Sequence, residues 1–258
     1  MSVVARGGSN HRLTLAYLGG GFAGWQRQIN ALSIQEVVET ALERVVGEPA
    51  RVHGASRTDA GVHAAGQEAH VTLARAWPAR ALVEGTNHHL PSSVRVLRSL
   101  AVAPDFHARE WAVAKEYHYR MSRRPVLPPF EAATTVRVPA RLDLERLRTA
   151  TALLEGRHDW SAFARAGGSH RQTFRRVFSA DVVEEGADLV FRIKGDGFLR
   201  GMVRALVGSL LWVATGRFSL ERWVELLEGG DRGAAGPSAP PHGLVLIRVF
   251  YPEETSER

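Results

Sequence analysis

Both halves of the chain alternate short strand patterns with short amphipathic helices, and this alternation limits the possible folds more than any other feature. Residues 11–17 alternate polar and apolar side chains as a half-buried strand does, and Ser33 caps a helix predicted to run to about Val46. The segments lack the long crossover spacing of a doubly wound parallel sheet. We therefore expect mixed, largely antiparallel α+β structure. In the first half, strands are also predicted at 51–53, 67–73 and 94–97, and a helix at 79–88.

The second half repeats this pattern. With 258 residues, 45% of them hydrophobic, the chain can bury two cores. Pro104 interrupts the pattern, so we expect one α+β domain over 1–105 and a second over 106–258, facing across a basic catalytic cleft. In the second half, strands are predicted at 115–120, 177–183, 188–194 and 244–251, and helices at 142–154, 201–216 and 220–227.

The composition excludes several kinds of chemistry. Cysteine is absent, which removes disulfides, thiolate metal sites and sulfur nucleophiles. The eleven histidines form no His-Glu-x-x-His pattern, and the adjacent His88 and His89 cannot share a face, so we expect no metal. No apolar run approaches the length of a membrane span, and the N-terminus lacks a signal-peptide core. We expect a cytoplasmic protein.

The charge points to a polyanionic partner. The formal net charge is +6, and arginine supplies every cation except Lys115 and Lys194. Arginine binds phosphate bidentately and stacks on bases, which suits RNA. A genome rich in G and C would explain the ratio of arginine to lysine equally well, but not the net charge.

Gly19, Gly21 and Gly24 fit the dinucleotide fingerprint G-x-G-x-x-G after a predicted strand. In that fingerprint the third glycine lies within the helix that binds the pyrophosphate. Here several residues separate Gly24 from the helix cap at Ser33. We therefore predict no dinucleotide cofactor.

Asp59 stands beside Arg57 in a loop of small residues between Gly54 and His63. Small residues let another molecule approach the backbone closely, as on the floor of a pocket, and an aspartate held there can act as a nucleophile. The competing interpretation is a polar turn in which Arg57 and Thr58 cap the end of a strand.

Lys115, Tyr117 and Tyr119 share one face of a predicted strand. Aromatic rings beside cations are suited to hold an unstacked nucleobase, although a Tyr-x-Tyr strand can equally be core packing. Upstream, Phe106 and Arg109 bring another aromatic ring and cation close together.

Arg204 lies inside an otherwise apolar helix. A buried arginine requires a carboxylate, and Asp59 is a candidate partner. Alternatively, the side chain reaches the surface along its aliphatic stem.

Eight short motifs occur in an order and spacing that resemble the tRNA pseudouridine synthase A family, and they extend over nearly the whole chain. The resemblance implies the pseudouridine synthase fold and a homodimer without cofactor. It also implies isomerisation of uridine at positions 38, 39 and 40 in the anticodon arm of tRNA. The motifs are Tyr17, Gly-Trp-Gln at 24–26, Ser-x-Gln at 33–35, Arg-Thr-Asp-Ala-Gly-Val-His at 57–63, Phe-His-Ala-Arg at 106–109, Tyr-x-Tyr at 117–119, Phe-Leu-x-x-Met-Val-Arg at 198–204 and Gly-Leu-x-Leu at 243–246.

Transferred by motif, Asp59 matches the catalytic aspartate, Tyr117 the tyrosine stacked on the uracil, and Arg204 the arginine paired with the aspartate. We also expect contacts to the substrate from Arg57, Arg109, Lys115, Tyr117 and Leu244. The sequence departs from the family pattern at Leu18 and at Ser56, which could change the backbone angles of the loop. The basic segment at 168–173 matches loosely, so Arg171 receives no role.

The expected reaction breaks the bond from ribose C1′ to N1 and forms one from C1′ to C5. Asp59 could attack C6 or C1′, or assist formation of a glycal as a base, and the sequence does not separate these routes. A uracil C5 methyltransferase is excluded because it needs a cysteine nucleophile. A non-catalytic RNA-binding module remains as the alternative.

Overall fold

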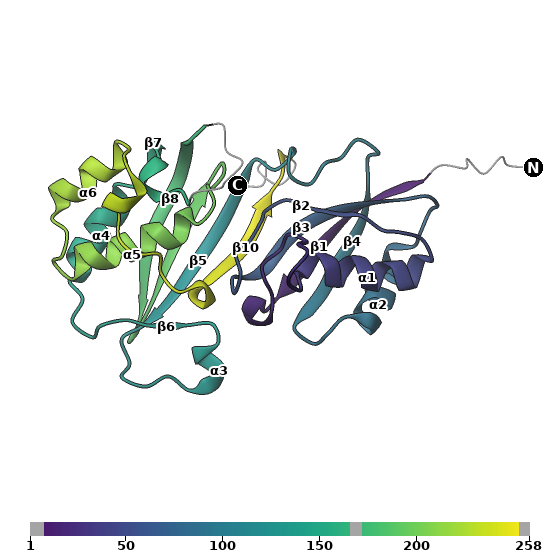
Figure 1. The fold of residues 1–258 in the computed structure, drawn as a ribbon, viewed down its shortest axis with the longest axis horizontal. Coiled ribbons are helices and arrows are strands. Elements are labelled where there is room, and N and C mark those ends of the chain that lie inside the picture. Colours follow the sequence, from purple (N-terminus) through teal and green to yellow (C-terminus); the bar gives the residue numbers. More distant parts are fainter. Residues whose placement is uncertain (1–7, 166–171, 253–258) are drawn as a thin grey trace, which may run out of the picture. The chain divides into compact units, whose positions relative to one another are not determined.

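The computed structural model describes residues 8–165 and 172–252, which form two compact units (Figure 1). The first unit comprises the described part of 1–113 together with the chain from Ile247 onward, and the second comprises 114–246. The division therefore lies later than the predicted boundary near residue 105. Residues after Pro104 remain with the first unit because Phe106 packs against Tyr251 and the Val113 amide donates to the Phe250 carbonyl.

The sheet of the first unit is antiparallel. Strand β1 (Ser9–Tyr17) pairs with β3 (His63–Leu73) on one side and with β4 (Val94–Val102) on the other. The short β2 (Val52–Gly54) pairs with β3. This arrangement places the residues between β2 and β3, including Asp59, in a connection between two hydrogen-bonded strands.

Two helices, α1 (Ile34–Val46) and α2 (Ala79–His89), pack against each other, and α2 also packs on β4 (Figure 1). The predicted cap of α1 is confirmed, since the Ser33 hydroxyl accepts a hydrogen bond from the Glu36 amide. The buried stripe of α1 differs in part from its apolar pattern. Gln35 and Glu39 are buried, and this polar pair belongs to the pocket described below.

The sheet of the second unit is mixed. Strand β9 (Asp188–Gly195) pairs antiparallel with β5 (Ala114–Ser122) and with β8 (Phe174–Glu185). Two shorter strands that the sequence pattern missed extend it. They are β7 (Gly156–Asp159), antiparallel to β8, and β6 (Val136–Arg137), parallel to β5.

Three helices of the second unit pack together, and α4 also contacts β8. They are α4 (Leu144–Ala152), α5 (Met202–Ala214) and α6 (Leu220–Leu227). Trp223 on α6 is fully buried, and its indole N–H donates to the Ala150 carbonyl of α4. The remaining elements are the short helix α3 (Pro129–Ala132) and β10 (Leu244–Phe250), which spans the division between the units.

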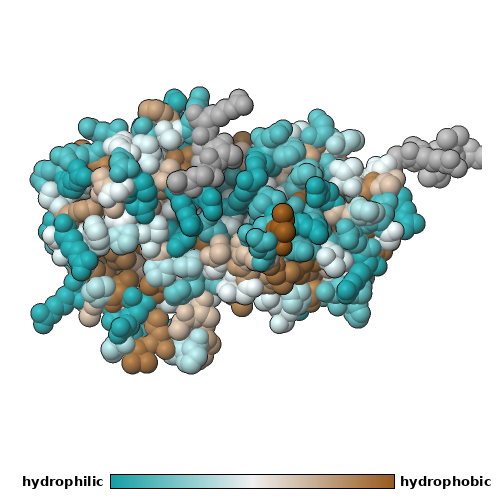
Figure 2. Space-filling model, in the orientation of Figure 1, coloured by the Kyte–Doolittle hydropathy of each residue, from teal (hydrophilic) through white to brown (hydrophobic). Residues whose placement is uncertain are grey.

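Both units thus combine helices with mainly antiparallel strands, which confirms the predicted α+β class. Figure 2 shows mostly hydrophilic side chains on the visible face, as expected where the apolar residues form the cores. Among the described residues, no helix has the length and apolar character needed to cross a membrane.

Candidate active site

The loop that carries Asp59 is fixed through its main chain by Gln67, a fully buried residue of β3. The Ser56 amide donates to Gln67 Oε1 at 3.2 Å, and Gln67 Nε2 donates to the Ser56 carbonyl at 2.6 Å. The preceding Ala55 amide donates to the Glu68 carbonyl at 2.7 Å. The Ser56 backbone is therefore bonded on both its polar groups, and its φ angle is not positive, so serine at this position leaves the loop unstrained.

The residues around Asp59 are fixed as well. The hydroxyls of Tyr17 and Thr58 form a hydrogen bond of 2.9 Å, and the Trp25 amide donates to the Thr58 carbonyl at 3.1 Å. The Val62 amide donates to the Asp59 carbonyl at 3.1 Å, which closes a turn that contains Gly61 at φ 79°. Asp59 itself is half-buried. Because the backbone is held on both sides of Asp59, its carboxylate can be kept in one orientation, as a nucleophile requires.

Two of the three glycines that imitate a dinucleotide fingerprint, Gly19 and Gly24, pack against this loop instead. A Cβ on Gly24, which has φ +96°, would lie 2.6 Å from the Thr58 carbonyl oxygen. A Cβ on Gly19 would lie 2.1 Å from the Val62 carbonyl oxygen. Both positions therefore need glycine because the segment packs backbone to backbone against the aspartate loop. The sequence alone did not indicate this role.

Three of the small residues in and beside the loop pack against the protein itself. A Cβ on Gly54 would lie 2.4 Å from the Trp25 ring, and Ala55 and Ala64 are buried in the core. Trp25 fills the space directly beside Gly54, although Gly54 also lines the pocket described next. The small-residue loop as a pocket floor stays a prediction.

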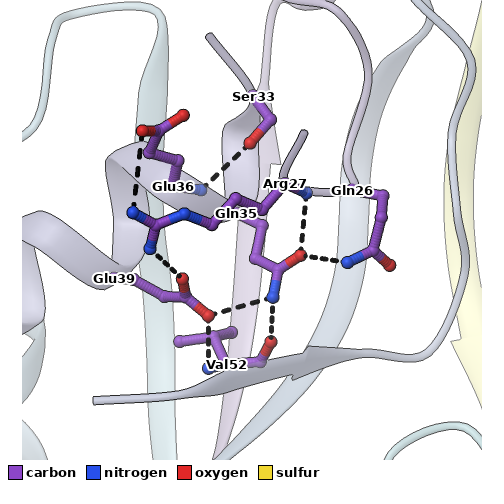
Figure 3. Close-up of polar contacts among 7 residues, drawn as sticks. All are labelled: Gln26, Arg27, Ser33, Gln35, Glu36, Glu39 and Val52. Atoms are coloured by element: carbon purple, nitrogen blue, oxygen red, sulfur yellow. Dashed lines mark hydrogen bonds and ion pairs between the residues drawn. The ribbon is translucent and has the colours of Figure 1, made fainter. Parts of the chain in front are cut away.

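A pocket of about 430 Å³ lies instead beside this loop, within the first unit. Part of its wall is a polar network, shown in Figure 3, in which Gln35 and Glu39 of α1 bind the backbone of Val52. Arg27 pairs with Glu39 at 3.2 Å and with Glu36 at 3.8 Å. The basic residues of the lining are Arg27, Arg51, His53, Arg57, His107 and Arg109.

Arg57 and Arg109, both predicted to contact substrate, lie in this pocket. Partial burial lowers the pKa of Arg109, and the nearby charge of Arg57 lowers it further. The two cations are therefore close enough to repel each other. An anion placed between them would remove that repulsion.

The second unit holds the tyrosines. Tyr117 on β5 is 5% exposed, and its ring meets that of Phe198 nearly perpendicularly with the centroids 5.2 Å apart. Tyr119 is fully buried, its hydroxyl donates to the Pro240 carbonyl at 2.9 Å, and burial raises its pKa. Tyr119 is thus a core residue. Lys115 is half-buried on the same strand, opposite Gly195 of β9.

Arg204, in the first turn of α5, is half-buried and is held by a loop. Its Nε donates to the Ala239 carbonyl at 2.8 Å, and the Ala239 amide donates to the Arg204 carbonyl at 2.9 Å. The loop approaches closely because residue 208 is glycine: a Cβ there would lie 1.7 Å from the Pro237 carbonyl oxygen. Leu244, the first residue of β10, is buried after this loop.

The structure thus groups the predicted site residues by unit. Asp59, Arg57 and Arg109 belong to the first unit, whereas Lys115, Tyr117, Arg204 and Leu244 belong to the second. The predicted ion pair of Asp59 with Arg204 would join residues of different units, and it stays a prediction. Arg171 lies outside the described residues.

Comparison with known proteins identifies the class. The family model described as tRNA pseudouridine synthase matches residues 150–252. Proteins named tRNA pseudouridine synthase A match nearly the whole chain. The one from Syntrophotalea carbinolica is 43% identical over 93% of this chain and 95% of its own. The one from Myxococcus xanthus is 44% identical over 93% of this chain and 91% of its own. The chain belongs to the tRNA pseudouridine synthase A family.

Proposed function

We propose that this chain converts uridine to pseudouridine at positions 38, 39 and 40 in the anticodon stem-loop of tRNA, with Asp59 as the nucleophile. Membership of the family makes it an isomerase acting on tRNA, and this is the observation that carries the proposal. The position of Asp59 in a loop fixed on both sides supports its role. The proposal includes a homodimer in the cytoplasm, with the anticodon arm as the bound part of the tRNA.

The reaction is an isomerisation. The bond from C1′ to N1 breaks, the uracil turns within the site, and C5 joins C1′ before it loses its proton. Atoms and electrons balance within the nucleotide, so the reaction requires no redox cofactor. Asp59 attacks C6 or C1′, or acts as a base on the way to a glycal. In the proposal Arg204 orients the carboxylate, and Tyr117 stacks on the uracil and relays the C5 proton: its hydroxyl oxygen takes that proton while its own proton passes to solvent.

Release of tritium from C5-labelled uridine in tRNA tests this function. Asp59→Asn keeps the size of the side chain but cannot attack carbon, so the variant should bind tRNA about as well as the parent and release no label. Asp105→Asn, at an exposed aspartate of the same unit, is the matched control and should behave as the parent. Turnover of Asp59→Asn within about tenfold of the parent, or ~1.4 kcal/mol of transition-state stabilisation, would rule out Asp59 as the nucleophile. A parent that binds tRNA without releasing label would instead be the RNA-binding module.

A further inference from the structure

The pocket beside the aspartate loop is lined by four arginines and by no carboxylate. Glu36 and Glu39 both bind Arg27, and Glu39 also accepts from the Val52 amide and from Gln35 (Figure 3). Arg27 is therefore paired with two carboxylates. The other arginines in the pocket have no such ion pair among the described residues.

Three arginines of the pocket lack an ion pair with a carboxylate. Among the residues that the structure describes, no carboxylate lies within ion-pair distance of Arg51, Arg57 or Arg109. The charge of Glu110 acts to raise the pKa of Arg109, but the Glu110 side chain is 75% exposed and its ion pair among the described residues is with His107 at 4.0 Å. Three cations converging on one pocket repel one another unless an anion joins them.

Each of these arginines projects from a fixed point of the backbone. Arg51 precedes Val52, whose amide and carbonyl groups are bonded to Glu39 and Gln35. Arg57 follows Ser56, which is bonded twice to Gln67. The backbone that carries these arginines is thus ordered before any ligand arrives, which lowers the entropic cost of binding one.

Arg109 is fixed by a stack of histidines. Its neighbour Ala108 donates its amide to His70 Nδ1 at 3.1 Å and accepts at its carbonyl from the Tyr251 hydroxyl at 2.8 Å. The ring of His70 stacks on that of His53 with the centroids 4.9 Å apart and contacts His107 at 4.6 Å. Burial and the two neighbouring histidines lower the pKa of His70 to about 4, so it stays a neutral acceptor for the Ala108 amide.

We propose that this pocket binds a phosphate of the RNA backbone next to the target nucleotide, through Arg51, Arg57 and Arg109. The adjacency follows from the chain, since Arg57 lies two residues before Asp59 in the same loop. Arginine presents paired N–H donors in the geometry that phosphate oxygens accept. This inference rests on the proposed function, and it adds which part of the substrate these arginines bind.

The first test measures the affinity of the full-length protein for tRNA as a function of KCl concentration. Arg51→Gln and Arg109→Gln should each weaken binding about tenfold at low salt. Each should also lower the magnitude of the slope of log affinity against log salt concentration by somewhat less than one, since one fewer phosphate is neutralised. Arg98→Gln removes an exposed arginine of β4 outside the pocket and is the matched control. An unchanged salt dependence in both pocket variants would overturn the proposal.

The second test locates the phosphate. Anticodon-arm RNAs with one uncharged methylphosphonate linkage each are compared on the parent and on Arg109→Gln. One linkage beside the target uridine should cost the parent about tenfold in affinity and cost the variant nothing further. Equal losses in the two proteins at every linkage would refute the assignment.

Two controls distinguish binding of a backbone phosphate from binding of a free nucleotide and from a failure of the proposed catalysis. UMP that binds the parent tightly and the pocket variants weakly, while tRNA affinity stays unchanged, would assign the pocket to a free nucleotide and overturn the proposal. Tritium release by the parent is measured in parallel. If the parent is active and the pocket substitutions leave tRNA affinity unchanged, the pocket proposal fails and the proposed function stands. If the parent is inactive and the pocket substitutions weaken tRNA binding, the proposed function fails and the pocket proposal stands.

Discussion

The aspartate loop of the first unit and the tyrosine strand of the second unit hold their functional residues in different ways. Around Asp59 the fixing groups are backbone amides and carbonyls, bonded to Gln67, to Glu68 and to each other. Around Tyr117 they are rings in van der Waals contact within a packed core. The position of the loop therefore depends on a few polar partners, whereas the position of Tyr117 depends on how well the neighbouring rings fill the core. Substitutions can distinguish these two ways of holding a residue.

The largest loss of stability is expected from Gln67→Leu. The change keeps a similar volume but removes both bonds to Ser56 and leaves its amide and carbonyl buried without these partners. At about 1–3 kcal/mol for each unsatisfied group, we expect about 3 kcal/mol less free energy of unfolding. Urea unfolding measures the loss, and turnover of the folded fraction should fall as well. Gln28→Leu, at an exposed glutamine of the same unit, serves as control. Stability equal to the control would mean that Gln67 does not hold the loop.

Arg204→Lys should have the next largest effect, and it should act on turnover. Lysine keeps the charge but not the planar fork, which must donate from Nε to the Ala239 carbonyl and, in the proposal, bind Asp59. We expect about a hundredfold lower kcat, equivalent to about 2.7 kcal/mol, with tRNA affinity unchanged. Single-turnover tritium release measures it. Near-normal turnover would show that Arg204 has only a structural role in the second unit.

Acid should weaken the first unit through His70. The pKa of this histidine is about 4 in the folded protein and near 6.5 in the unfolded chain, so the unfolded chain binds more protons between these values. Stability is then constant above about pH 6.5, falls as the pH decreases, and levels off below about pH 4. Between pH 7.5 and 5 this histidine alone should cost about 2 kcal/mol. Urea unfolding at the two pH values, on the parent and on His70→Gln, measures the difference. An equal pH dependence in both proteins would contradict this assignment.

The sequence predicts local structure better than it predicts contacts between distant segments. The helices were predicted well because apolar periodicity and capping are local: α6 has the predicted bounds, and Ser33 caps α1 as expected. The strands β6 and β7 were missed because strands of two and four residues are too short to show an alternating pattern of polar and apolar side chains. The motifs predicted site residues, which stay a prediction, and they did not indicate what holds those residues. The roles of Gly24 and Gln67 depend on contacts between segments far apart in the sequence, and a list of residue types contains no such contacts.

The smallest effects are expected at the two tyrosines, and here the comparison is sharpest. Tyr119→Phe removes the hydrogen bond to the Pro240 carbonyl, so we expect about 1 kcal/mol less free energy of unfolding and turnover within about twofold of the parent. Tyr117→Phe keeps the ring against Phe198, and turnover should fall if the hydroxyl relays the C5 proton. Each variant controls for the other because each removes one tyrosine hydroxyl from the same strand. Unfolding curves and tritium release on both proteins give the result. Equal turnover in the two variants would show that the Tyr117 hydroxyl takes no part in the reaction and that the residue acts through its ring alone.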